Sequence, residues 1–119
     1  MKDDKVYIWD MVQACQKIRQ YLDGATIDDL STNSMLFDAV VREFQVLGEA
    51  AGKTSEESRR RFPNIPWRVI IDMRNVIVHE YSGIEIPQIW ETAQTDIPPL
   101  LQALLPMFQE IENDISSNA

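Results

Sequence analysis

The chain has 119 residues, of which 45% are hydrophobic and 25% are charged. This length and composition are typical of a single soluble domain with one hydrophobic core. Residues 1–5 precede no apolar stretch of signal-peptide length, and no run approaches the roughly 20 apolar residues that a membrane span needs. We therefore predict one domain over residues 1–119 in a cytoplasmic protein.

The charge of the chain is distributed unevenly. The net charge is -8, yet all 11 Lys and Arg residues lie in residues 1–74, and residues 75–119 carry only acids. An acidic protein is a poor general binder of nucleic acid, so a coat-like role is excluded and an anionic ligand should bind locally. Six of the 11 bases fall in one segment, which is either the binding site for such a ligand or a solvated basic helix face. They are Lys53, Arg59, Arg60, Arg61, Arg68 and Arg74.

Apolar residues recur at helical spacing from the N-terminus. The first helix is expected over residues 4–22, with Asp3 or Asp4 as its N-cap and Asp23-Gly24 at its end. Cys15 lies on the apolar face of this helix and has no second cysteine to pair with, so we expect it to be a buried small hydrophobic residue.

Capping residues mark the next elements. A short turn is expected at 26–30, and Asn33 or Ser34 starts a second long helix that should end at Gly52. The sequence Thr54-Ser55-Glu56-Glu57 has a capping-box pattern and predicts a short helix that runs through three arginines to Phe62.

Prolines divide the second half of the chain. Pro66 can start a helix that includes the apolar run 76–78, which has no strand-like alternation. A final helical region is expected from Pro87, kinked or divided at Pro98-Pro99 and Pro106. The pattern predicts an all-α, up-and-down bundle of four to five main helices with a frayed tail at 113–119.

The chemistry-bearing residues gather at 74–81, where Arg74, Asn75, His79 and Tyr81 follow an apolar helix. His79 is the only histidine. On a regular helix, positions five residues apart are about 140° apart, so Arg74 and His79 share one site only if the helix distorts or a second subunit completes a groove. One histidine and one cysteine make no zinc site, and the remaining chemistry is acid-base catalysis with an arginine clamp.

The ordered motif Arg-Asn-x-x-x-His-x-Tyr at 74–81 resembles the HEPN superfamily, and specifically its HepT-like ribonuclease toxins. Similar segments span almost the whole chain. They are Asp38-Ala39-Val40-Val41-Arg42, Gly48-Glu49-Ala50-Ala51, Pro66-Trp67-Arg68, Ile70-Ile71, Met73-Arg74-Asn75, Trp90-Glu91-Thr92 and Asp96-Ile97-Pro98.

The resemblance implies a homodimer whose two Arg-His pairs line one cleft, and a ribonuclease that uses no cofactor and no metal. Arg74 would hold the scissile phosphate, His79 would transfer protons, and Asn75 would orient the substrate or the histidine. Candidate RNA contacts are Arg59, Arg60, Arg61 and Arg68.

The resemblance also implies a toxin-antitoxin pair, in which an MntA-like nucleotidyltransferase antitoxin adds AMP to Tyr81. A bulky anionic nucleotide there would obstruct the cleft and repel RNA phosphate. Val76 occupies a position where many relatives carry a second basic residue. An alternative is therefore a catalytically silent HEPN module that docks a nucleotidyltransferase or binds a nucleotide.

Overall fold

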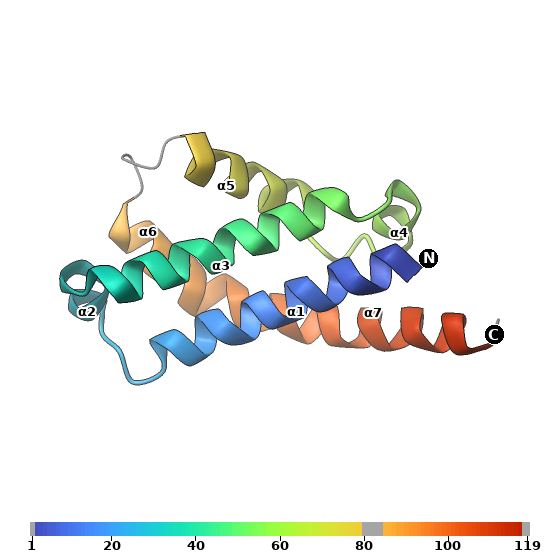
Figure 1. The fold of residues 1–119 in the computed structure, drawn as a ribbon, viewed down its shortest axis with the longest axis horizontal. Coiled ribbons are helices and arrows are strands. Elements are labelled where there is room, and N and C mark those ends of the chain that lie inside the picture. Colours follow the sequence, from blue (N-terminus) through green and yellow to red (C-terminus); the bar gives the residue numbers. More distant parts are fainter. Residues whose placement is uncertain (1, 80–84, 118–119) are drawn as a thin grey trace.

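The computed structural model describes residues 2–79 and 85–117, and the side chains of residues 3–73 and 85–116. The described residues form helices and no strand, which confirms the all-α prediction (Figure 1). The four long helices are α1 (Lys2–Leu22), α3 (Ser34–Lys53), α5 (Trp67–His79) and α7 (Ile97–Ser117). The shorter elements are α2 (Ile27–Thr32), α4 (Glu56–Arg61), α6 (Ile86–Glu91) and the π-helical η2 (Thr92–Asp96).

The long helices pack around one core. Helix α1 lies against both α3 and α7, and α3 in turn lies against α5 (Figure 1). Ile8, Phe44 and Leu104 are fully buried and come from three of these helices. Helix α5 packs mainly against α3, which therefore connects it to the rest of the bundle. Cys15 is also fully buried, as expected.

The predicted start of α3 is confirmed, since the Asn33 side chain accepts a hydrogen bond from the Leu36 backbone at 3.1 Å. The expected turn at 26–30 is instead helix α2. The Thr26 side chain accepts from the Asp29 backbone at 3.2 Å, and the Asp29 carboxylate accepts from the Thr26 backbone at 2.8 Å. This reciprocal cap satisfies two backbone donors and stabilises a short helix.

Two helices extend beyond their predicted ends. Helix α3 passes Gly52 and is closed at Thr54, whose backbone donates to the carbonyl of Ala50. Helix α7 continues through Ser117, so residues 113–117, predicted as part of a frayed tail, are helical in the structure. The physical reason is a long-range ion pair in the last turns of α7, which holds them to α4.

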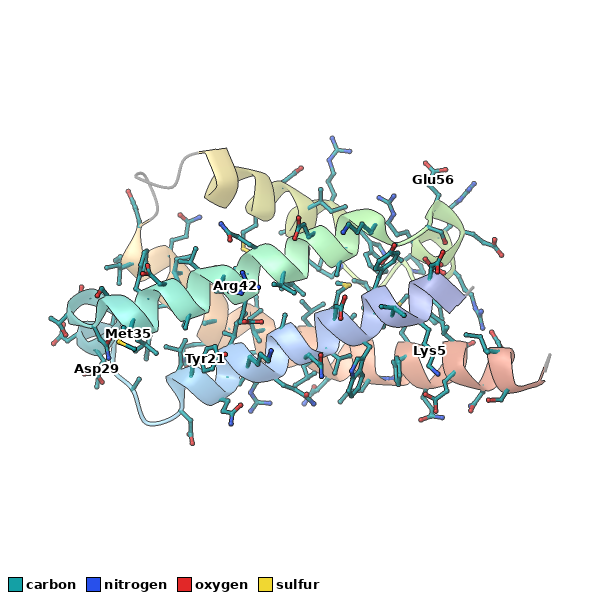
Figure 2. All side chains as sticks on the ribbon, in the orientation of Figure 1. Lys5, Tyr21, Asp29, Met35, Arg42 and Glu56 are labelled. Carbon is teal, nitrogen blue, oxygen red and sulfur yellow. The ribbon has the colours of Figure 1, made fainter. Side chains whose placement is uncertain are left out.

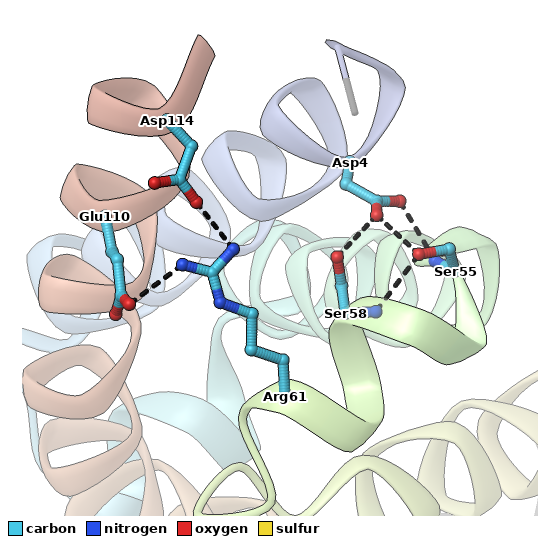
Figure 3. A network of polar contacts seen from close by, with 6 residues as sticks. All are labelled: Asp4, Ser55, Ser58, Arg61, Glu110 and Asp114. Atoms are coloured by element: carbon cyan, nitrogen blue, oxygen red, sulfur yellow. Dashed lines mark hydrogen bonds and ion pairs between the residues drawn. The ribbon is translucent and has the colours of Figure 1, made fainter. Parts of the chain in front are cut away.

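That ion pair is formed by Arg61 (Figure 3). Its two terminal nitrogens lie 2.8 Å from Glu110 and 2.6 Å from Asp114. Hydrogen bonds to Glu110 and then to Asp114 raise the pKa of the Arg61 guanidinium, which therefore keeps its charge. Arg61 thus serves the fold by joining α4 to α7.

Asp4 does not cap its own helix, because α1 already begins at Lys2. Instead its buried carboxylate reaches the start of α4 (Figure 3). It accepts hydrogen bonds from the Ser55 backbone at 2.9 Å and from the hydroxyls of Ser55 and Ser58 at 2.6 Å each. Burial alone would raise the pKa of Asp4, but the hydrogen bonds from Ser55 and Ser58 outweigh burial and lower it.

We expect Asp4→Ala to lower the free energy of unfolding by about 2–3 kcal/mol, since it leaves the buried Ser58 hydroxyl and the half-buried Ser55 hydroxyl without their charged acceptor. A carboxylate with a lowered folded-state pKa stabilises the fold above its unfolded pKa, and this contribution is lost as pH falls through the folded pKa. Urea unfolding at pH 7 and in acid measures both effects. Asp3→Ala, at an exposed neighbouring position, is the control. An equal loss in the control, or an unchanged loss in acid, would contradict this role.

Candidate functional site

The sequence-predicted site falls on α5, whose backbone carries Arg74, Asn75 and His79. Helix α5 is α-helical from Trp67 to His79, so the structure shows no change of helix type between Arg74 and His79. Their Cα positions are therefore separated by about 7.5 Å along the axis and about 140° around it. The side chains of residues 74–79 and all of Tyr81 lie outside the described residues.

The start of α5 is fixed by packing and by one side-chain hydrogen bond. The Trp67 indole nitrogen donates to the Phe62 carbonyl at 3.1 Å, and Trp67 is 8% exposed. Ile70 is buried against the core. Trp67 is thus part of the fold, and the position of the second half of α5 follows from this anchored first half.

An apolar groove runs between α5 and α7, and its described lining includes Met73, the residue directly before Arg74. We call it the α5–α7 groove, and its volume is about 410 Å³. Val69 lines it and is 66% exposed, which is a large exposure for an aliphatic side chain beside the core. The lining residues are Leu47, Asn64, Pro66, Val69, Ile70, Met73, Thr92, Asp96, Ile97, Pro99, Leu100 and Ala103.

The polar side of this groove comes from the π-helical segment η2, which contributes Thr92 and Asp96. Pro98 and Pro99 have no backbone N–H and cannot donate to the carbonyls one turn earlier. The regular series of α-helical hydrogen bonds is therefore interrupted before them. The Ile97 backbone accordingly bonds to the Thr92 carbonyl, five residues back. The predicted division at Pro98-Pro99 is confirmed, whereas Pro106 lies inside α7 without ending it. Such π segments are frequent at functional sites.

Glu43 is a buried acidic residue that the sequence reasoning missed. It is 6% exposed and lies on α3, one turn before Leu47 of the α5–α7 groove. Helices α3 and α5 pack against each other and run in opposite directions (Figure 1). The available signal was a carboxylate within the apolar stripe formed by Val40 and Leu47, since buried carboxylates are rare.

The four candidate RNA-contacting arginines separate into two groups. Arg61 is held by Glu110 and Asp114. The others line one open groove of about 700 Å³ between α4 and the start of α5, which we call the arginine groove. They are Arg59, Arg60 and Arg68.

The described part of the chain gives little support for a cysteine nucleophile or a metal site. Burial raises the pKa of the Cys15 thiol to about 12, so it is not a thiolate nucleophile at neutral pH. Among the described side chains, at residues 3–73 and 85–116, no group of three or more His, Cys, Asp or Glu residues is placed to hold a metal ion. No helix across residues 2–79 and 85–117 is both long and apolar enough to cross a membrane.

The fold and site together define an all-helical bundle with an Arg-x4-His motif on one long helix and Tyr81 two residues beyond. A family model described as "Ribonuclease HepT-like" matches residues 11–107. The chain belongs to the HepT-like ribonuclease family. No solved structure gives a significant match.

Curated relatives support this family over most of the chain. A Caldanaerobacter subterraneus protein named "Putative RNase" is 30% identical over 92% of this chain and 98% of its own length. A Thermococcus cleftensis protein named "Probable ribonuclease HepT" is 29% identical over 83% of this chain and 90% of its own length. A longer Methanocaldococcus jannaschii protein, named "Gamma-glutamylcyclotransferase and putative RNase", is 31% identical over 95% of this chain. This chain spans only 51% of the length of that relative.

Proposed function

We propose that the chain is a metal-independent ribonuclease toxin that cleaves RNA through Arg74 and His79. The observation that carries this proposal is the match to the HepT-like ribonuclease family over residues 11–107, a range that includes both residues. Relatives that cover nearly the whole chain are named as ribonucleases. The continuous helix α5 adds a rigid support for the two backbone positions.

The proposed reaction begins when a ribose 2′-oxygen attacks the adjacent phosphorus. The bond from phosphorus to the 5′-oxygen then breaks, which leaves a 2′,3′-cyclic phosphate and a 5′-hydroxyl. One base removes the proton from the 2′-hydroxyl, and one acid protonates the leaving 5′-oxygen. Arg74 stabilises the charge that develops on the phosphate, His79 transfers protons, and Asn75 orients the substrate or the histidine.

This chemistry needs an acid and a base, while one chain supplies one histidine. We propose that a homodimer supplies the second histidine in a shared cleft. The apolar α5–α7 groove supports this arrangement, because Val69 is 66% exposed there and the groove reaches the residue before Arg74. Covering the groove with a second copy would remove apolar surface from water and bring two α5 helices together.

We further propose that AMP transfer to the Tyr81 hydroxyl silences the toxin and that a nucleotidyltransferase antitoxin performs it. The added phosphate is negative and would repel RNA close to His79. Incubation with the partner enzyme and ATP should add one AMP to the wild-type chain and stop cleavage. Tyr81→Phe should cleave RNA and resist both changes, as read by intact-mass spectrometry and a cleavage assay. Inhibition of Tyr81→Phe equal to that of wild type would contradict this control point.

The proposed activity is tested by incubating a mixed cellular RNA pool with the purified chain in EDTA. Cleavage supports a metal-independent nuclease. If the pool stays intact, the chain is better described as a HEPN module that docks a nucleotidyltransferase or binds a nucleotide. The absence of basic residues from 75–119, which carry seven acids, favours that second function.

A further inference from the structure

The arginine groove brings three basic side chains from two helices to one open surface. Arg59 and Arg60 come from α4, and Arg68 comes from the first turns of α5. Pro63 and Pro66 in the intervening segment also line the groove, so the connection between the helices forms part of its wall. In a chain with net charge -8, this is a local concentration of positive charge.

The contacts of the arginines decide which of them can bind a ligand. Arg60 lies 3.6 Å from Glu56, and Arg68 lies 3.5 Å from Asp72. The side chains of Arg60 and Arg68 are 79% and 90% exposed, and exposed pairs of this kind contribute little to stability. Their guanidinium groups can therefore exchange a carboxylate for a phosphate at small cost.

Arg59 is positioned more firmly. Its Nε donates to the Thr54 carbonyl at 3.1 Å, and the side chain is half-buried. This backbone contact uses one guanidinium nitrogen and fixes the direction of the group without neutralising its charge. Arg61, by contrast, has two short contacts with carboxylates and belongs to the fold.

The position of the groove relative to α5 suggests its ligand. Arg74 follows Arg68 by six residues, which is about 9 Å along an α-helix and about 120° around its axis. Successive phosphates of one stacked strand are about 3.4 Å apart along the axis, so roughly three nucleotides span this distance. A flexible single strand bound at Arg74 can therefore reach the arginine groove if it also curves partly around α5.

We propose that Arg59, Arg60 and Arg68 bind the sugar-phosphate backbone of single-stranded RNA on one side of the scissile bond. This inference rests on the proposed ribonuclease function. The groove contributes affinity without base specificity, because guanidinium contacts to phosphates carry no sequence information. Trp67 lines the same groove, but its indole nitrogen is bonded to Phe62 and its side chain is buried, so it is not a stacking platform.

The test uses a labelled single-stranded RNA and the full chain carrying His79→Ala, so that binding is measured without cleavage. Arg59→Gln, Arg60→Gln and Arg68→Gln are added together. Each phosphate contact contributes about 0.7 to the slope of log affinity against log salt, so the slope should fall by about 2. At 0.1 M salt, removing these three contacts should weaken RNA binding by about 100-fold relative to the His79→Ala parent.

The matched control replaces three exposed bases outside the groove with glutamine: Lys17, Arg19 and Arg42. Arg42 lies midway along α3, away from Glu56 of the arginine groove (Figure 2). The control changes net charge equally and should leave the salt slope nearly unchanged. Circular dichroism confirms that both triple variants fold.

An unchanged slope in the groove variant, or an equal fall in the control, would overturn the proposal. Either result is independent of catalysis. If the wild-type chain cleaves RNA but the groove variant binds as tightly as its parent, the groove is wrong and the proposed function stands. If the groove variant loses binding while the wild type cleaves nothing, the proposed function fails and RNA binding at the groove stands.

Discussion

Replacing His79 with alanine is expected to lower the rate of RNA cleavage by about 10²–10⁴-fold, because it removes the only imidazole that can transfer protons in each chain. Arg74→Ala should lower the rate by about 10²–10³-fold, since it removes the charge that stabilises the phosphate in the transition state. Initial rates on a labelled RNA in EDTA, at equal protein concentration, measure both losses.

Arg42→Ala is the control for these variants, because Arg42 is exposed on α3 and outside both grooves. It should cleave at the wild-type rate. Thermal unfolding distinguishes lost chemistry from lost fold, and all three variants should melt within a few degrees of wild type. A folded His79→Ala variant with wild-type activity would contradict the assignment of the histidine.

Mixing subunits should reveal whether the two histidines of a dimer act together. If both are needed in one cleft, a dimer with one His79→Ala subunit is inactive, and activity follows the square of the wild-type fraction. An equal mixture, refolded together, should retain about one quarter of the activity of the same total amount of wild-type protein. Independent sites would retain about one half.

The control for subunit mixing is wild type refolded with an equal amount of an unrelated protein, which should keep the activity of its own wild-type share. Sedimentation of the mixture checks that dimers are present at assay concentration. A monomer with full activity would contradict the shared cleft and the role given to the α5–α7 groove. It would leave Arg74 and His79 as candidates within one chain.

Local features of the fold were predictable because their causes are local. The apolar stripe of residues 4–22, the cap at Asn33 and the interruption before Pro98 each depend on residues within one or two turns. The all-α class follows from the same periodicity. The family motifs, which occur in order along most of the chain, then located the candidate site on one helix.

Long-range contacts explain where the predictions failed. Asp4 was one of two candidate caps of its own helix, with Asp3, but its partners Ser55 and Ser58 lie 51 and 54 residues away in the sequence. Arg61 was one of four candidate RNA contacts, which stay untested, and its ion pairs with Glu110 and Asp114 on α7 could not be predicted from local sequence. Local propensity contains no information about which helix lies opposite a given side chain.

The candidate site at Arg74 and His79 remains a prediction from the motif, and its surroundings could not be predicted from the sequence. The motif places Arg74 and His79 on one helix, while the groove that Met73 lines depends on how α5, η2 and α7 pack. The burial of Glu43 likewise follows from the packing of α3. The three accessible arginines became distinct from Arg61 only when their ion pairs were known.

The most direct test of the central claim is the chemical nature of the RNA ends that the wild-type chain produces in EDTA. Mass spectrometry of a cleaved oligonucleotide should show a 2′,3′-cyclic phosphate, or the monophosphate formed from it, on one fragment and a 5′-hydroxyl on the other. A DNA oligonucleotide of the same sequence should remain intact. Fragments with 3′-hydroxyl and 5′-phosphate ends, or cleavage of the DNA, would contradict attack by the ribose 2′-oxygen and therefore the mechanism assigned to Arg74 and His79.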